Sequence, residues 1–221
     1  ELRLVGSEMC IRDRINSKDR ESYLKRYDQR LEIYGYDPRA LGWGGGKERQ
    51  RLRFRKLFEI SRFIDKKITS VLDVGCGFGD FYEFIALDYN EVSYHGLDIN
   101  ENLLNIASEK YPREGRFTLG TLSECKSKIS RPDVVIESGM FNAKLEHESQ
   151  IEYVKNSVRE MYEFCKFGVA ADFMTDRVDW VADGAFHLKP DLALEIGFGI
   201  TKKVILRHDY LPYEYCIYLL K

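Results

Sequence analysis

Three glycines at alternating positions, Gly75, Gly77 and Gly79, are the residues whose type and spacing most clearly suit binding chemistry. A glycine-rich turn between a strand and a helix brings backbone N–H groups close to a ligand at the carboxyl edge of an open α/β sheet. Asp73 precedes this turn and Asp80 follows it, at the position where a dinucleotide-binding pattern would have its third glycine. Because a carboxylate at position 80 would repel a pyrophosphate, we expect a ligand without phosphate, whose positive charge Asp73 could complement.

A further carboxylate, Asp98, ends the second expected strand and follows the glycines at the distance, about 20 residues, at which an acidic residue accepts the hydroxyls of a ribose. The alternative is that Asp98 only caps the helix expected to begin at Glu101, as an aspartate before a helix often does. The glycine turn and the acidic strand end support each other. Together they predict a nucleoside-containing ligand.

The elements that position these residues alternate between short β-rich runs and longer helical stretches, a pattern typical of βαβ units and a parallel sheet. The last two runs are joined by a few residues around Leu211 and Pro212, which is too short for a crossover, so they must be antiparallel neighbours. We therefore expect an α/β fold with three layers and a Rossmann-like, seven-stranded, mostly parallel sheet that ends in an antiparallel hairpin. The expected strands are 70–74, 93–97, 116–119, 133–137, 168–174, 203–208 and 213–220. The expected helices are 79–88, 101–110, 122–127, 149–165 and 190–197.

The chain before the first strand has a different character. Residues 1–14 resemble a peptide found at the ends of unrelated translated sequencing assemblies, so we treat them as a non-native or disordered leader; the alternative is a short native strand. Residues 15–64 are expected to form an N-terminal helical cap with one helix over Tyr23–Tyr36, a glycine-rich loop, and a second helix over Lys47–Ile64. Residues 65–221 form the binding domain, which makes one structural domain with the cap.

Composition narrows the function classes. The chain has 221 residues and a formal net charge of −2, which is not the electrostatic signature of a protein bound to nucleic acid or to an anionic membrane. The exception is the basic segment from Lys47 to Lys67, which we interpret as a helix with a solvated basic face rather than a polyanion site. The five cysteines are scattered without spacing that suits zinc or disulfides, and no apolar run could cross a bilayer. We expect a cytoplasmic protein without a metal.

Four segments resemble the successive cofactor motifs of the class I S-adenosylmethionine (SAM)-dependent methyltransferases: VLDVGCGFGD, YHGLDIN, FTLGTL and PDVVIESGMFN. The resemblance covers about residues 41–221 and implies that SAM is the cofactor. It implies that the three glycines line the methionine and ribose portion, that Asp98 holds the ribose and that Ile99 packs on adenine. Ser138 is expected to be a further cofactor-binding residue. Thr121 and Leu122 would face the adenine edge, although Thr121 stands where the family more often has an aspartate.

A narrower resemblance, to a small bacterial subfamily often associated with surface-polysaccharide or small-molecule biosynthesis, rests on the Gly42-Trp43 loop, on Gln50 and the 51–54 segment, on Ser138-Gly139 with Asn142, and on the closing LRHDYLPYEY. It implies that Trp43 and Arg53 reach the carboxylate end of the cofactor. The alternative for Arg53 is a solvated helix position.

The acceptor must lie above the carboxyl ends of the strands, next to the sulfonium, which leaves the loops 137–144, 175–190 and 208–213. Methyl transfer to an acceptor can depend largely on positioning and exclusion of water, so a base is optional. By chain position His208 or Asp209 is the best candidate for a base, with Tyr210 or Asn142 orienting the acceptor. Trp180 and His187 belong to a loop that could cover the substrate or be a solvated connection.

Absent motifs narrow the acceptor. The sequence lacks the Asn/Asp-Pro-Pro-aromatic arrangement of enzymes that methylate base amines, a Pro-Cys dipeptide for attack on pyrimidines, and the paired glutamates of protein arginine methyltransferases. We therefore expect methyl transfer to a small-molecule acceptor, with a sugar or sugar-nucleotide hydroxyl or amine as the leading class. An RNA-directed methyltransferase and a non-catalytic SAM-binding subunit are the alternatives, and the oligomeric state is left open.

Overall fold

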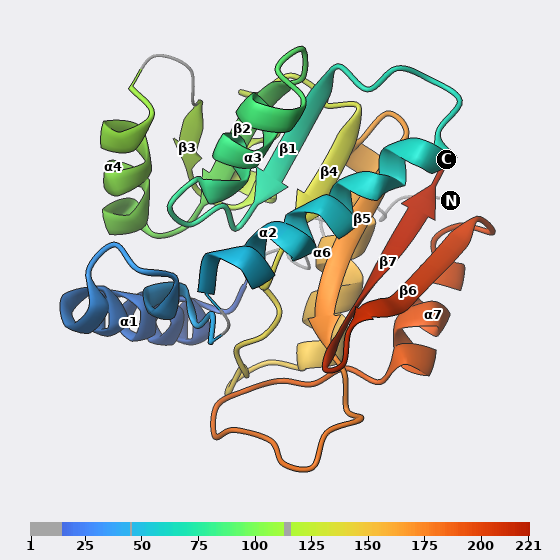
Figure 1. The fold of residues 1–221 in the computed structure, drawn as a ribbon. Coiled ribbons are helices and arrows are strands. Elements are labelled where there is room, and N and C mark those ends of the chain that lie inside the picture. Colours follow the sequence, from blue (N-terminus) through green and yellow to red (C-terminus); the bar gives the residue numbers. More distant parts are fainter. Residues whose placement is uncertain (1–14, 45, 113–115) are drawn as a thin grey trace, which may run out of the picture.

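A seven-stranded sheet in the order β3-β2-β1-β4-β5-β7-β6 forms the centre of the structure, a computed structural model that describes residues 15–44, 46–112 and 116–221 (Figure 1). Strands β1 to β5 are parallel, and β7 is antiparallel to both of its neighbours, β5 and β6. The order reverses between β1 and β4, and open α/β sheets bind ligands beyond the carboxyl ends of the strands at such a point. The strand bounds are β1 Ser70–Val74, β2 Ser93–Asp98, β3 Phe117–Leu119, β4 Val134–Glu137, β5 Gly168–Met174, β6 Val204–Leu211 and β7 Glu214–Leu220.

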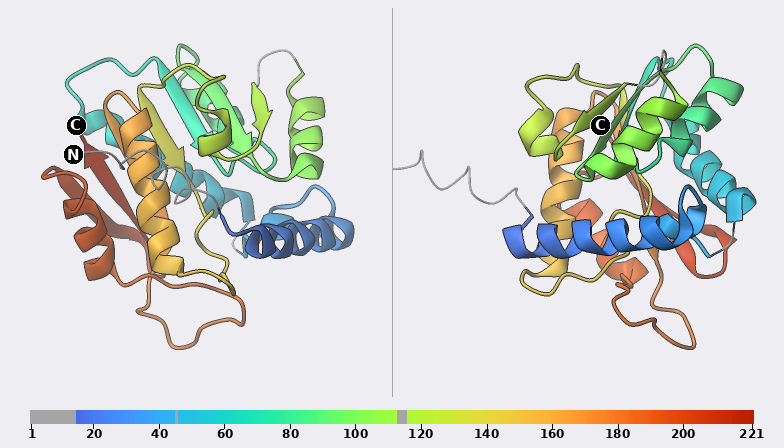
Figure 2. Two further views of the ribbon diagram at one scale, coloured as in Figure 1. Left: turned by 180° about the vertical axis from the view of Figure 1, so that it is seen from behind. Right: turned by 90° about the vertical axis from the view of Figure 1, so that its left-hand side faces the viewer.

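Helices cover both faces of this sheet, which confirms the expected three-layer, Rossmann-like class (Figures 1 and 2). Helices α2 and α3 pack on one face, and α5, α6 and α7 pack on the other. The helix bounds are α1 Ser17–Tyr34, α2 Gly46–Phe58, α3 Asp80–Asp88, α4 Glu101–Lys110, α5 Leu122–Cys125, α6 Gln150–Phe164 and α7 Pro190–Phe198, with short 3₁₀ helices at Pro38–Leu41 and Glu59–Phe63. None of the helices in these ranges has the length and apolar character that crossing a membrane would need.

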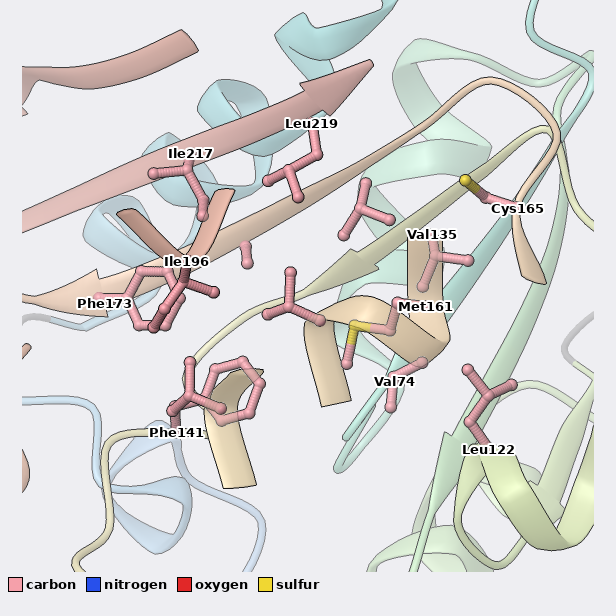
Figure 3. Close-up of a cluster of buried hydrophobic side chains, with 14 of the residues drawn as sticks. Val74, Leu122, Val135, Phe141, Met161, Cys165, Phe173, Ile196, Ile217 and Leu219 are labelled. Atoms are coloured by element: carbon pink, nitrogen blue, oxygen red, sulfur yellow. The ribbon is translucent and has the colours of Figure 1, made fainter. Parts of the chain in front are cut away.

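The central strands are apolar on both faces because each face is covered by helices. Leu72 and Val135 project into the cluster beneath α6 and α7, which Figure 3 shows, while Val71 and Val134 project into the cluster beneath α2 and α3. All four side chains are at most 1% exposed. This double burial fixes the strands, and thereby fixes where the strand ends deliver their polar residues.

Helix starts are set by polar caps close to the carboxyl edge of the sheet. The Asn100 side chain accepts a hydrogen bond from the Leu103 N–H at 3.0 Å and caps α4. Thr121 caps α5 in a reciprocal arrangement with Glu124, so that both side chains satisfy backbone N–H groups of the first turn. Since Asn100 is the cap of α4, Asp98 does not have that role, and the alternative that it is only a helix cap is wrong.

Helix α1 runs below the carboxyl ends of β1 and β2 in the view of Figure 1 and is tied to the loops there. The Tyr23 hydroxyl donates to a backbone carbonyl, 2.9 Å from Met140 O and 3.1 Å from Ala143 O, and Arg26 donates to Gly184 O at 2.9 Å. The helix begins at Ser17, earlier than the expected Tyr23, because the Asn16 side chain caps it through the Lys18 N–H. Residues 1–14, our expected leader, lie outside the described residues.

Two further boundaries differ from expectation. The basic helix ends at Phe58 and continues as the 3₁₀ helix Glu59–Phe63. Strand β6 extends to Leu211 rather than to His208, because it follows β7 through an irregularity in the register between Arg207 and Leu211. His208, Asp209 and Tyr210 therefore belong to a strand, and the expected acceptor loop 208–213 is reduced to the tip of a hairpin.

Candidate active site

The turn between β1 and α3 requires its glycines. Gly75, Gly77 and Gly79 have φ angles of 78°, 53° and 71°, a left-handed region that side chains rarely adopt. A Cβ at Gly75 would lie 3.2 Å from the Met140 side chain, and one at Gly77 would lie 3.0 Å from Leu41. At Gly79 a Cβ would lie 2.7 Å from the Phe117 ring, so this glycine allows close packing behind the turn and does not line the cavity described next.

A cavity of about 1050 Å³, including its solvent-open part, lies against this turn and the ends of β1, β2 and β4. Its walls are the glycine turn, the strand ends, and residues of α1 and α6. Most of the expected cofactor residues line it, namely Trp43, Gly75, Gly77, Asp98, Ile99, Thr121, Leu122 and Ser138. The other three expected cofactor residues, Asp73, Gly79 and Arg53, do not line this cavity.

Asp98 lines this cavity, and its carboxylate holds the glycine turn through hydrogen bonds. Its Oδ2 accepts a hydrogen bond from the Gly77 N–H at 2.8 Å, and its Oδ1 accepts one from the Asn100 N–H at 2.9 Å. Burial raises the pKa of Asp98, and these backbone N–H groups oppose the rise. Each carboxylate oxygen keeps a further lone pair, so Asp98 could accept two adjacent ribose hydroxyls.

Replacing Asp98 by alanine is expected to weaken SAM binding by about 1.5–3 kcal/mol, which is the range for losing hydrogen bonds to a charged group. Isothermal titration with SAM measures the change. Asp98→Asn is the control, because it keeps one acceptor oxygen, and a thermal-unfolding scan of both variants reports whether the Gly77 turn has collapsed. An unchanged dissociation constant for a folded Asp98→Ala protein would remove Asp98 from the site.

Asp73 lies beneath the turn and outside the cavity lining. It is 4% exposed, and its Oδ2 accepts a hydrogen bond from the Tyr94 hydroxyl at 2.8 Å. Burial raises the pKa of Asp73 to about 7, opposed in part by that hydrogen bond. The expectation that Asp73 faces the positive charge of the cofactor is wrong in this geometry, because its side chain points into the sheet toward β2.

The raised pKa of Asp73 makes a pH-dependent contribution to stability. In the unfolded chain Asp73 ionises near its ordinary pKa of about 3.9, whereas the folded protein holds the proton up to about pH 7. The folded state therefore binds more protons in this window, and the free energy of unfolding falls as the pH rises from about 4 to about 7. Asp73→Asn, whose side-chain oxygen can still accept from Tyr94, is expected to gain stability relative to the wild type by about 1–4 kcal/mol across that range. Urea unfolding at pH 5 and pH 8 measures it; a pH-independent difference would contradict it.

Asp80 is neutralised by its neighbours. Its carboxylate accepts hydrogen bonds from the Tyr36 hydroxyl at 2.8 Å, from Lys110 Nζ at 2.9 Å and from Gln50 Nε2 at 3.3 Å. It lines neither cavity, and it joins α3 to the N-terminal segment. Because Lys110 pairs with Asp80, the charge of this carboxylate does not by itself exclude a pyrophosphate, and this part of the expectation is not supported.

Ser138 lines the cavity above two buried carboxylates. Its hydroxyl donates to Asp172 Oδ2 at 2.8 Å, the Gly139 N–H donates to Asp172 Oδ1 at 2.9 Å, and the Met140 N–H donates to Glu137 Oε2 at 3.0 Å. Burial raises the pKa of Asp172 to about 6; burial and then the Asp172 charge hold the pKa of Glu137 well above its usual range. These carboxylates shape the turn after β4.

A second cavity, of about 1660 Å³ with its solvent-open part, adjoins the first. The two share four lining residues, Tyr27, Leu41, Trp43 and Gly139. Gly139 is required there, because it has a φ of 83° and its Cβ would lie 2.8 Å from the Trp43 ring. The expected substrate residues Asn142, Trp180 and His187 all line this second cavity.

Arg53 forms the floor of the second cavity. Its guanidinium stacks over the Trp43 ring at 3.8 Å from the ring centroid and pairs with Glu214, which also binds Arg49 at 2.9 Å. The Arg53 side chain is 5% exposed, so it is not a solvated helix position. Its Nη1 has no hydrogen-bond partner among the described residues. Arg53 therefore lines the second cavity and not the first, with its guanidinium stacked on the Trp43 ring.

His208, Asp209 and Tyr210 do not reach either cavity. His208 is exposed with its ring 5.7 Å from that of Tyr215, and Asp209 pairs with Arg207 at 2.8 Å on the surface. Tyr210 packs against the cluster beneath α2. The interpretation of these residues as base and orienting groups has no support in this geometry, because β6 is the edge strand of the sheet, two strands beyond β5.

Sequence reasoning missed the wall that α1 and α6 contribute. Tyr23 and Tyr27 of α1 and Ser157, Glu160 and Met161 of α6 line the cofactor cavity. The tyrosine stripe of α1 was visible as helical periodicity, but nothing in it indicated a ligand. The position of α6 gave no signal before the fold was known.

Comparison with known proteins finds similarity to methyltransferases. Residues 71–168 match the family described as methyltransferase domain. A protein of Mycobacterium tuberculosis named as a methyltransferase is 23% identical over 158 residues, which are 69% of this chain and 93% of that protein. The Synechocystis magnesium protoporphyrin IX methyltransferase with bound SAM superposes with a TM-score of 0.60 at 16% identity, over 94% of this chain and 100% of that one. The plantazolicin methyltransferase BpumL in complex with S-adenosylhomocysteine (SAH) gives a TM-score of 0.66 at 14% identity, over 92% and 97%.

The match over 71–168 contains the glycine turn, Asp98, Thr121 and the β4 turn, which are the same segments that line the cofactor cavity. The glycine turn leaves no room for side chains where the cofactor would approach, and the strand end offers an acceptor for ribose hydroxyls. The residues present thus fit SAM, and the protein is a SAM-dependent methyltransferase with the class I, Rossmann-like fold.

Proposed function

We propose that this enzyme methylates a hydroxyl or amine of a polar small molecule held in the second cavity, with a sugar or sugar nucleotide as the acceptor class. The observation that carries the proposal is the cavity itself, which meets the cofactor cavity at Trp43 and Gly139. An acceptor there would approach the cofactor from the side on which its methionine portion is expected.

The lining of the second cavity supports a polar acceptor with an anionic part. It is lined by aromatic rings, by the carboxylates Asp179, Asp183 and Glu214, and by four arginines, Arg26, Arg30, Arg49 and Arg53. Glu214 pairs with Arg49 and Arg53, whereas Arg26 and Arg30 donate to main-chain carbonyls, so these two are the guanidinium groups that could bind an anionic group. Guanidinium groups bind phosphate with paired hydrogen bonds, and aromatic faces pack on the apolar side of a sugar or on a base. The Oδ1 of Asn142 is buried without a partner among the described residues, so it could accept a hydrogen bond from an acceptor hydroxyl or amine.

We assign to His187 the role of the general base that takes the proton from the acceptor. Its Nδ1 lies 2.6 Å from the carbonyl oxygen of Thr175. Because a carbonyl oxygen can only accept, Nδ1 must carry the hydrogen, which leaves the lone pair on Nε2. Thr175 is fully buried and pairs with Leu188, so the ring has a fixed support. Bound SAM supplies the methyl group on a sulfonium, and His187 Nε2 would take the proton that the acceptor loses.

The basic helix does not favour an RNA acceptor. Arg49 and Arg53 of α2 point to Glu214, and Arg51 pairs with Asp88 at 2.8 Å. Much of the positive charge of the helix is therefore matched by carboxylates of the same molecule, and little remains to bind a phosphate backbone.

A screen for methyl transfer tests the proposal. The protein is incubated with methyl-labelled SAM and with separate pools of sugar nucleotides, sugar phosphates, small carboxylates and transfer RNA, and products are resolved by mass. Transfer to a sugar or sugar nucleotide is expected, and it should be lost in Asn142→Leu while SAH binding stays unchanged. Transfer only to RNA or to apolar compounds, or transfer unaffected by Asn142→Leu, would overturn the proposed acceptor class.

A further inference from the structure

Glu160 is a carboxylate of α6 that lines the cofactor cavity at the end where Gly120, Thr121 and Leu122 also line it. By the resemblance of the β3 motif, this is the adenine end of the cavity. Among the described residues that line the cavity, Asp98 and Glu160 are the two with a carboxylate. Asp98 is engaged by the Gly77 turn at the ribose end.

One oxygen of Glu160 is held by the protein. Oε1 accepts a hydrogen bond from the Ser123 hydroxyl at 2.7 Å and from Lys126 Nζ at 3.1 Å. The side chain is 12% exposed. No hydrogen bond to Oε2 is found among the described residues, so Ser123 and Lys126 fix the carboxylate in place while its second oxygen is left to accept from a ligand.

The other candidates near the adenine edge are committed elsewhere. The Thr121 hydroxyl accepts from the Glu124 N–H at 3.3 Å. The Glu124 carboxylate takes the Thr121 N–H at 2.8 Å and Arg20 at 2.8 Å. Neither side chain therefore has a carboxylate oxygen free to accept a hydrogen bond from an amino group.

We propose that Glu160 Oε2 accepts a hydrogen bond from the exocyclic amino group of the cofactor's adenine. Thr121 stands where related enzymes more often have an aspartate. In this protein Glu160 of α6 supplies the carboxylate instead. Glu160 selects adenine over a purine with a carbonyl oxygen at the same position, because two facing acceptors leave both unsatisfied.

The test compares two ligands that differ only in that group, SAH and S-inosylhomocysteine, by isothermal titration. The wild-type protein is expected to prefer SAH by about 10- to 100-fold, the cost of an unmade hydrogen bond to a charged group. Glu160→Gln should lose most of this preference, since an amide can donate to the carbonyl oxygen. Glu163→Gln, on the exposed side of the same helix, is the matched control and should keep it.

A second variant separates recognition from support of the fold. Thr121→Asp still caps α5, since aspartate is as good a cap as threonine, and it adds a carboxylate at the adenine edge. Combined with Glu160→Gln, it should restore the preference for SAH. A Glu160→Gln protein that keeps the full wild-type preference would overturn the proposal, and so would loss of affinity for both ligands by the same factor. The readout is binding, so it is independent of the identity of the acceptor.

Discussion

Replacing His187 by alanine is expected to lower kcat by about 10²- to 10⁴-fold on a hydroxyl acceptor that the screen identifies, which is the range that a positioned base contributes. The physical reason is the fixed tautomer, since the Thr175 carbonyl holds the hydrogen on Nδ1 and leaves Nε2 to receive a proton. Radiolabel transfer under saturating SAM measures the rate.

The matched control is His208→Ala, which removes an exposed imidazole outside both cavities and should leave kcat within about twofold of the wild type. SAH affinity should be unchanged in both variants, because neither residue lines the cofactor cavity. If His208→Ala is the slower enzyme, or if His187→Ala loses no rate at any pH, the assignment of the base to His187 is wrong.

Replacing Glu214 by glutamine is expected to lower the free energy of unfolding by about 3–5 kcal/mol, the cost of breaking a buried ion pair. Glu214 is 8% exposed and neutralises two guanidinium groups, those of Arg49 and Arg53. Without its charge, the Arg53 guanidinium would stay buried behind Trp43 with no opposite charge in contact. Guanidinium chloride unfolding measures the change.

Asp209→Asn serves as the control for this prediction. It also breaks a carboxylate–arginine pair, but Asp209 is 58% exposed, and exposed pairs contribute about 0–1 kcal/mol. If the two variants lost the same free energy of unfolding, burial would not be the reason why the Glu214 ion pair is strongly stabilising.

The sheet and its cofactor edge could be predicted from sequence because they depend on local patterns. Apolar runs such as residues 134–136 mark strands buried on both faces, and the closely spaced glycines mark the turn, where they adopt positive φ angles. Asp98 can be identified because it ends the strand that follows the glycine turn. The information for these elements lies within a few residues along the chain.

The rest of the site depends on contacts between distant segments, which no local pattern encodes. His187 was predicted only as a loop residue near the substrate, and its support by Thr175 depends on a bridge between two parts of that loop. His208 was preferred as a base because a hairpin tip was expected there, but the register of β6 with β7 extends the strand. Nothing in the sequence indicates that Glu160 lies at the cofactor cavity, because its position depends on how α6 packs beside α5.

The hydrogen bonds that tie α1 to the loops after β4 and β5 end on main-chain atoms of those loops. The Tyr23 hydroxyl donates to one of two nearby carbonyls, Met140 O or Ala143 O, and Arg26 donates to Gly184 O, so these partners are main-chain groups that every residue type carries. The side chains of these loops can therefore be exchanged while α1, which lines the cofactor cavity, keeps these hydrogen bonds. An enzyme with this arrangement could therefore change its acceptor specificity during evolution without losing its affinity for SAM.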